Sequence, residues 1–264
     1  MNFGTTQKQV SEDCTFRHET SNVDMCCFIH LNWIGLSGSI SKIYRNFSGM
    51  EKTILHDKEL DVFFNIRAKS YRESWFAGRL LAKNFYVKQC IPKQNIAWKN
   101  IRIASRNSFG KSVSPQLLVN DVDTGFTFSI SHVADKAIVV VPTCFTEGIG
   151  CDLVYRETST PGIAKIFFHD TEIDVSQNQI SFDSVWAIKE AAYKSCKCKE
   201  AFQPRQWLTQ KIKENHYLCR HLDLNQQLFA DVETLTIGEY ILAVARRIRC
   251  GPLCNNLNKN IISL

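Results

Sequence analysis

The stretch WAIKEAAYK, residues 186–194, is the strongest structural signal in the sequence. It contains neither Gly nor Pro and is rich in Ala and other good helix formers, so it predicts a helix. At about 100° per residue, Trp186, Glu190 and Lys194 fall within about 80° of one another, and Lys189 lies about 60° to the other side. One face of this helix therefore carries an aromatic ring, a carboxylate and two ammonium groups.

Two interpretations of this face are open. In the first, it belongs to an ordinary amphipathic surface helix, on which Glu190 and Lys194 form an i, i+4 ion pair worth a few tenths of a kcal/mol. In the second, it is one wall of a functional site to which segments upstream contribute. The upstream segments favour the second interpretation.

The stretch GIGCDLV, residues 148–154, predicts a short apolar strand that contains one carboxylate, Asp152. A buried carboxylate is costly unless it is paired or bound to a metal. Gly148 and Gly150 would let a bulky ligand or a metal approach the backbone. Glu190 could supply a second carboxylate to the same ion, since two carboxylates with waters and phosphate oxygens are the usual way to hold Mg²⁺.

Side chains of the types that bind a diphosphate lie on other predicted elements. Lys111 stands on a Gly turn, and Ser131 and His132 end a predicted strand over residues 126–132. A predicted helix over residues 70–88 is basic as well as apolar. Each feature is weak alone, because a lone His is more often a satisfied structural residue. The prediction of a diphosphate-binding site therefore rests on the order and spacing of these features taken together.

Composition limits the possible functions. With 264 residues, 44% of them hydrophobic, the chain can bury one large core or two smaller ones. The net charge of +6 suits an acidic or phosphate-rich partner but is too small to indicate nucleic acid by itself. We expect no membrane span and no signal peptide. The 11 cysteines form no paired C-x-x-C knuckles with His partners, so we interpret them as reduced cytosolic thiols rather than a zinc site.

Strands and helices occur in a similar order in both halves of the chain, without a fixed-period repeat. We expect a loose segment over residues 1–25, a strand over 25–34 and a loop over 35–48. Further elements are expected as a strand over 137–141, a helix near 162–168, and three antiparallel strands over 217–224, 228–232 and 239–248. We divide the chain into an N-terminal half, 1–143, a C-terminal half, 144–250, and a tail, 251–264.

Four motifs, in this order, resemble those of the 4′-phosphopantetheinyl transferase superfamily: FGK at 109–111, FSISH at 128–132, IGCDL at 149–153 and WxxKEAxxK at 186–194. The length is similar to that of the large, monomeric branch, in which two similar α/β halves form a pseudodimer. The resemblance therefore implies an α+β fold in which each half has a small, mainly antiparallel sheet packed on a long helix.

The resemblance also implies roles for the matching residues. Asp152 and Glu190 would bind Mg²⁺, and Glu190 and Lys194 would take part in the chemistry. The implied contacts to coenzyme A are Lys111, Ser131, His132, Lys189, Lys194, Arg72 and Arg79. Two positions depart from the pattern. Val154 stands where larger relatives carry an acidic residue, so water or another group would complete the metal shell, and Ser112 replaces the proline that commonly follows Gly-Lys.

The implied reaction transfers 4′-phosphopantetheine from coenzyme A to a serine of an acyl or peptidyl carrier protein and releases adenosine 3′,5′-bisphosphate. The implied partners are coenzyme A and the carrier protein, without nucleic acid or membrane, and the implied state is a cytoplasmic monomer. The alternative is a degenerate member that holds coenzyme A or a carrier without turnover. A basic nucleic-acid binder is disfavoured, because no module of that kind is recognised.

Overall fold

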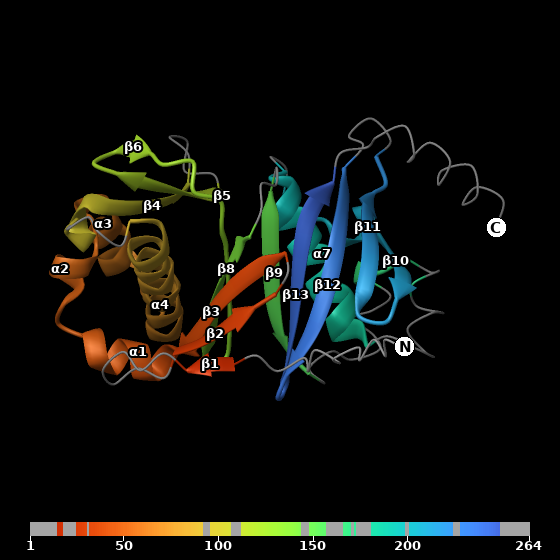
Figure 1. Ribbon diagram of the computed structural model, residues 1–264, viewed down its shortest axis with the longest axis horizontal. Helices are drawn as coiled ribbons and strands as arrows, with labels where there is room; N and C mark the ends of the chain where they lie inside the picture. Colours follow the sequence, from red (N-terminus) through yellow and green to blue (C-terminus); the bar gives the residue numbers. More distant parts are fainter. Residues whose placement is uncertain are drawn as a thin grey trace, which may run out of the picture.

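The structure is a computed structural model that describes residues 15–17, 25–30, 32–91, 96–106, 112–143, 148–156, 166–169, 172, 181–198, 201–223 and 228–248. Its main elements are two five-stranded antiparallel sheets and two long helices (Figure 1). The α+β fold is therefore confirmed.

In the described residues of the first half there are five strands of one sheet, a separate three-stranded sheet and four α-helices. The strands of the larger sheet are β1 (Thr15–Arg17), β2 (Met25–Ile29), β3 (Trp33–Ser39), β7 (Ser129–Val133) and β8 (Lys136–Pro142). The smaller sheet comprises β4 (Ile101–Arg106), β5 (Ser112–Val119) and β6 (Val122–Asp123). The helices are α1 (Ile40–Phe47), α2 (Glu51–Ile54), α3 (Asp57–Asn65) and α4 (Lys69–Phe85), which continues into a π-helical turn, Tyr86–Cys90.

The second half contains one sheet and the other long helix. Its elements are β9 (Ile149–Tyr155), α7 (Phe182–Cys196), β10 (Trp207–Lys213), β11 (His216–His221), β12 (Phe229–Ile237) and β13 (Tyr240–Ile248). The strand order is β10-β11-β12-β13-β9, and in the first half it is β1-β2-β3-β8-β7. In both sheets the strand before the long helix pairs with the last strand of its half: β3 with β8, and β9 with β13.

Helix α7 forms as its sequence predicts. Ser181 caps its N-terminus by accepting a hydrogen bond from the N–H of Ser184, and Lys197 ends it in the left-handed conformation at φ 53°. Its buried face is built from small and branched side chains, chiefly Ala187, Ile188 and Ala191. Small side chains let the helix lie close to the sheet.

The layers follow from three groups of buried side chains. One lies between α4 and the first sheet, and another lies between α7 and the second sheet. The third joins the two sheets and includes Trp33, Ile138 and Val140 from the first with Cys151 and Leu153 from the second. The sheets thus pack against each other between the two helices, and α7 lies behind its sheet in Figure 1.

Several expected element boundaries are wrong. The expected strand over residues 25–34 is two antiparallel strands, β2 and β3, and the expected loop over 35–48 holds the end of β3 and all of α1. Within the expected loose lead-in, residues 15–17 pair with β2. Strand β10 was not expected. Most of the expected helix near 162–168, and the tail beyond 250, lie outside the described residues.

A buried Lys–Glu pair recurs in both halves. Lys83 of α4 lies 2.5 Å from Glu59, and Lys189 of α7 lies 2.5 Å from Glu172. Each carboxylate also accepts a backbone N–H of the next strand, β4 at 2.9 Å and β10 at 2.7 Å. The recurrence is also visible in the sequence, where HDKE at 56–59 returns as HDTE at 169–172. The pseudodimer itself stays a prediction.

The described cysteines are buried or half-buried thiols. Burial raises the pKa of Cys151, Cys196 and Cys219 to about 12, and none of these three cysteines forms a disulfide. In the described part of the chain, no helix is long and apolar enough to cross a membrane.

Candidate functional site

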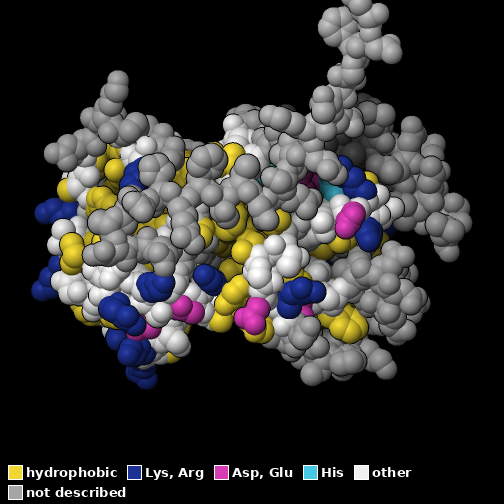
Figure 2. Space-filling model, turned by 60° about the horizontal axis from the view of Figure 1, so that its bottom comes forward, with side chains coloured by type: hydrophobic (Ala, Val, Ile, Leu, Met, Phe, Trp, Pro, Cys, Tyr) yellow, Lys and Arg dark blue, Asp and Glu magenta, His cyan; other side chains and the backbone are white. Residues whose placement is uncertain are grey.

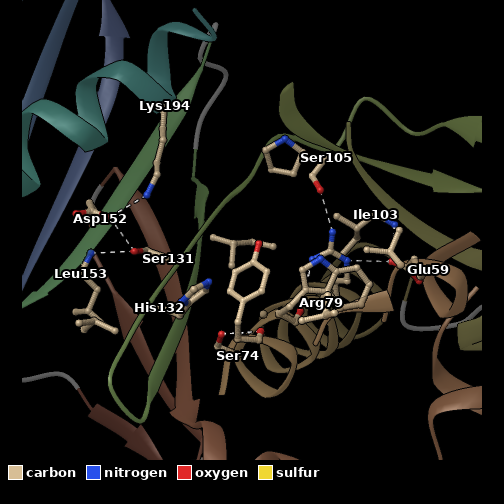
Figure 3. A pocket seen from close by; sticks show the side chains of 18 of the residues that line it. Glu59, Ser74, Arg79, Ile103, Ser105, Ser131, His132, Asp152, Leu153 and Lys194 are labelled. Atoms are coloured by element: carbon tan, nitrogen blue, oxygen red, sulfur yellow. Dashed lines mark hydrogen bonds and ion pairs between the residues drawn. The ribbon is translucent and has the colours of Figure 1, made fainter. Parts of the chain in front are cut away.

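A cavity of about 830 Å³ lies where the first half meets the second. One wall comes from α3, α4 and β4, and the other comes from β7, β9 and α7. Figure 3 shows the two walls facing each other, with Arg79, Ser105 and Glu59 on one side and Ser131, Asp152 and Lys194 on the other. Arg79, the predicted site residue of α4, therefore lines the same cavity as the predicted site residues of β7, β9 and α7.

Asp152 projects from β9 and is almost completely buried, with 5% of its surface exposed. Its Oδ1 accepts hydrogen bonds from Ser131 Oγ at 2.9 Å and from Lys194 Nζ at 2.8 Å. Burial raises the pKa of Asp152 to about 6, and the negative charge of Glu190 acts in the same direction, while Lys194 opposes both.

Lys194 joins the two carboxylates. Its Nζ lies 2.8 Å from Asp152 and 3.1 Å from Glu190, and it donates to the carbonyl of Cys151 at 3.0 Å. Burial disfavours the charge on Lys194, but Asp152 and Glu190 outweigh it and raise its pKa above the ordinary value. The predicted i, i+4 ion pair is therefore present, and a strand carboxylate extends it into a three-residue cluster.

Glu190 is held in place on its own helix. Its Oε2 accepts a hydrogen bond from Trp186 Nε1 at 3.1 Å, and Oε1 faces Lys194. Trp186 is in turn packed edge-on against Phe167 and Phe202. Glu190 therefore connects the aromatic ring and the ammonium that the sequence places on the same helical face.

His132 lies beside this cluster at the end of β7 and lines the cavity. Its ring meets the ring of Tyr71 edge-on, with 6.3 Å between the centroids. Although part of the ring is accessible, desolvation in the cavity wall lowers the pKa of His132, and the cations Lys194 and Arg79 add to this.

Arg79 lines the opposite wall. Its guanidinium stacks on the ring of Trp75, 3.4 Å from the centroid, and Nη2 donates to Ser105 Oγ at 2.9 Å. Nε lies 3.6 Å from Glu59 and has no hydrogen-bond partner among the described residues. Burial lowers the pKa of Arg79 to about 10. Arg72 does not line this cavity; its guanidinium lies over the ring of Phe63, 5.5 Å from the centroid.

Comparison with protein families identifies the second half. Residues 148–245 match the family model of the 4′-phosphopantetheinyl transferase superfamily. This region, which holds Asp152, Glu190 and Lys194, belongs to that superfamily. Comparison with curated proteins gives no match. Membership of the phosphopantetheinyl transferase superfamily supports phosphopantetheine transfer as the general activity, with coenzyme A and Mg²⁺ as the molecules that the superfamily uses.

Lys189, like Arg72, is a predicted coenzyme A contact that does not line this cavity. Its side chain is completely buried, and Nζ contacts Glu172 and donates to the carbonyl of Pro204 at 3.0 Å. It does not line the cavity. Neighbouring residues on a helix point about 100° apart, so Lys189 can be buried against Glu172 while Glu190 lines the cavity. In this structure Lys189 is thus a buried partner of Glu172 rather than a residue of the cavity wall.

Gly148 and Gly150 serve the helix rather than a ligand. A Cβ at Gly150 would lie 2.0 Å from the carbonyl oxygen of Ala191, and one at Gly148 would lie 1.9 Å from that of Ser195. Helix α7 therefore packs directly on the backbone of β9, which is what brings Glu190 and Lys194 to Asp152. Gly78 likewise lets α4 pack closely on β7, since a Cβ there would lie 2.8 Å from the side chain of Ile130.

The two carboxylates fit a magnesium ion of the kind that the superfamily uses. One ammonium, that of Lys194, already contacts both, so Asp152 and Glu190 lie within reach of a single cation. Val154 lines the same cavity and offers no oxygen. Among the described residues, no group of three or more His, Cys, Asp and Glu side chains is arranged to hold a metal. Waters and phosphate oxygens would have to complete the shell.

Two further features complete the description of the site. Lys111 and the rest of the predicted FGK turn lie outside the described residues. A second cavity of about 270 Å³ adjoins the first at Lys194, and its lining combines apolar side chains such as Phe126 and Ile149 with polar ones such as Asp123 and Lys197.

Proposed function

We propose that this protein transfers the 4′-phosphopantetheine group of coenzyme A to a serine of an acyl or peptidyl carrier protein. The observation that carries the proposal is the contact of one lysine, Lys194, with Asp152 and Glu190 in the wall of a large cavity. A buried carboxylate that shares a cation with a second, half-buried one in a cleft is typical of a functional site. The family match over the same residues supports the reaction class.

Asp152 and Glu190 would hold the magnesium ion. Bound there, the ion would neutralise negative charge on the diphosphate of coenzyme A as the P–O bond breaks. The residues themselves would have two tasks: the carboxylates would fix the ion at one end of the cavity, and His132 and Arg79 would offer donors to phosphate groups of coenzyme A. Lys111 and Arg72 stay proposed contacts.

The size and charge of the cavities suit coenzyme A. The first cavity, at about 830 Å³, lies at the upper end of the usual range for ligand sites and has cationic side chains in both walls. We place the nucleotide and phosphates there and the less polar pantetheine arm in the second cavity, beyond Lys194. The reacting phosphate would then lie beside Lys194, which lines both cavities.

In the reaction, the serine oxygen of the carrier bonds to the β-phosphorus, and the bond from that phosphorus to the oxygen bridging the two phosphates breaks. A serine hydroxyl is a poor nucleophile near neutral pH, so Glu190 would accept its proton, directly or through a water. Lys194 would stabilise or protonate the leaving phosphate of adenosine 3′,5′-bisphosphate. The pKa of Lys194 lies above its ordinary value, so it carries the positive charge for this task.

The partner surface and the assembly are part of the proposal. Helices α1 to α3 lie at the left-hand end of the molecule in Figure 1 and carry exposed lysines and arginines such as Lys42, Arg45 and Lys52. Dark-blue side chains gather at the left-hand end in Figure 2. An acidic carrier would be attracted to such a surface. We propose a cytoplasmic monomer in which residues 1–143 and 144–250 form a pseudodimer.

The test is the mass of purified apo carrier proteins after incubation with this protein, coenzyme A and Mg²⁺. A panel of fatty-acid, polyketide and nonribosomal-peptide carriers would show which class is modified. Addition of the mass of phosphopantetheine to one of them supports the proposal. Binding of coenzyme A without any modified carrier in the panel would favour the alternative, a degenerate member that binds without turnover.

Val154→Glu is expected to tighten Mg²⁺ binding. Val154 and Asp152 are two residues apart on β9 and line the same cavity, as the two-residue period of a strand requires. A carboxylate at position 154 would add one negative charge and an oxygen ligand. The measurement is the Mg²⁺ concentration for half-maximal transfer at fixed coenzyme A, which should fall. If a folded Val154→Glu protein needs as much Mg²⁺ as the wild type, residue 154 does not face the metal.

His132→Ala is expected to weaken coenzyme A binding by about 1.5–3 kcal/mol, the value of a charge-assisted contact. Lys111→Ala should act in the same way. Calorimetry with coenzyme A and dephospho-coenzyme A would separate contacts to the 3′-phosphate from contacts to the diphosphate. Lys213→Ala is the control, because Lys213 is exposed on a strand outside the cavity wall. A change below about threefold for both ligands would mean that His132 is structural.

A further inference from the structure

Two serines of β7 connect the halves of the protein. The sheet orders place β7 at one edge of the first sheet and β9 at one edge of the second. Backbone N–H groups of β9 donate to serine hydroxyls of β7: Cys151 N to Ser129 Oγ and Leu153 N to Ser131 Oγ, both at 3.0 Å. The serine oxygens of β7 thus accept backbone N–H groups of β9, as the carbonyl oxygens of a neighbouring strand do inside a sheet.

Ser131 makes one contact that Ser129 does not. While its oxygen accepts from Leu153, its hydroxyl hydrogen is donated to Oδ1 of Asp152 at 2.9 Å. Only 5% of Ser131 is exposed. A hydroxyl has one hydrogen to donate, and the hydrogen of Ser131 is used. A phosphate of coenzyme A, which needs a donor, would have to compete with the carboxylate for it.

The orientation of Asp152 depends on this contact. Oδ1 receives donors from two elements, Ser131 on β7 and Lys194 on α7, so the carboxylate is held from both sides. Of these two donors, Lys194 is the one that the proposed reaction also uses. Ser131 is then the donor that can stay on Asp152 throughout, and because it donates, it favours the ionised carboxylate.

We infer that Ser131 is a positioning residue, which fixes the Asp152 carboxylate for the metal, rather than a contact to the phosphates of coenzyme A. The inference rests on the proposed function, because it takes Asp152 as a metal ligand. It corrects the role that the sequence motif implied for Ser131. It also makes the metal site depend on both halves of the chain, since one half supplies the ligand and the other supplies the residue that orients it.

The test compares Ser131→Ala with Ser129→Ala, which removes the matching bond to the β9 backbone without touching Asp152. Mn²⁺ serves as the probe metal, and its binding is measured by electron paramagnetic resonance with coenzyme A present and no carrier. Outer-shell partners of metal ligands typically change affinity by about 10–100-fold, so Ser131→Ala should weaken Mn²⁺ binding by at least about tenfold. Ser129→Ala should leave it unchanged. Ser131→Thr, which keeps the hydroxyl, should restore it.

Coenzyme A binding in the presence of a chelator separates the two roles of Ser131. It should be unchanged in Ser131→Ala if the serine acts only through Asp152. Weaker coenzyme A binding in chelator, with normal Mn²⁺ binding, would overturn the inference and make Ser131 a phosphate contact. Equal loss of Mn²⁺ binding in both alanine variants would overturn it too, because the hydrogen bonds between β7 and β9 would then affect the site only by holding the two strands together. The wild type reports on the proposed function separately: a wild-type protein that binds no Mn²⁺ would refute the metal role of Asp152 itself.

Discussion

Asp152→Ala is expected to abolish phosphopantetheine transfer while leaving the fold intact. The side chain lies at the cavity wall, and its neighbours Ile149, Cys151 and Leu153, which fill the core between the sheets, are unaffected. Several kcal/mol of transition-state stabilisation should be lost with the metal, which corresponds to a rate lower by about a thousandfold or more. The measurement is the rate of holo-carrier formation by mass spectrometry, with circular dichroism to confirm folding.

Asp152→Asn is the matched variant. The amide keeps the size of the side chain and one oxygen that Ser131 can donate to, but it removes the charge that a metal and Lys194 require. We therefore expect Asn to be nearly as inactive as Ala, and excess Mg²⁺ to restore only part of the rate. Normal turnover by either folded variant would show that Asp152 is not a metal ligand.

Lys189→Ala is expected to destabilise the protein rather than to weaken coenzyme A binding. The substitution leaves the carboxylate of Glu172, which is 3% exposed, without its ammonium partner. Breaking a buried ion pair from one side costs about 3–5 kcal/mol, because the remaining charge is uncompensated. The free energy of unfolding, measured in denaturant, should fall by about that amount. Coenzyme A affinity of the molecules that stay folded should not change.

Two comparisons test this explanation. Lys83→Ala removes the equivalent ammonium from Glu59 in the first half and should cost less, because Arg79 still lies 3.6 Å from that carboxylate. The double variant Lys189→Met with Glu172→Gln removes both charges and should recover part of the loss, since no unpaired charge remains. If Lys189→Ala left the unfolding free energy unchanged but weakened coenzyme A binding, Lys189 would return to the set of phosphate contacts.

Local sequence determined much of the site. Helix α7 follows from composition and capping, and its period alone brings Glu190 into contact with both Trp186 and Lys194. The two-residue period of β9 likewise places Asp152 and Val154 on the same face of the strand. These relations hold because they involve residues within one turn of a helix or one repeat of a strand, where backbone geometry fixes the distance.

The tertiary structure decided the rest. That Lys194 reaches Asp152, that Ser131 donates to Asp152, and that Lys189 is paired with Glu172 are contacts between elements far apart in the chain. Each depends on how α7 lies on β9, and Gly148 and Gly150 set that approach by leaving room for the helix backbone. Periodicity specifies which residues share a face, but the direction of that face depends on the packing of the whole core. For this reason two adjacent residues, Lys189 and Glu190, have different surroundings: one is buried against a carboxylate, and the other faces the cavity.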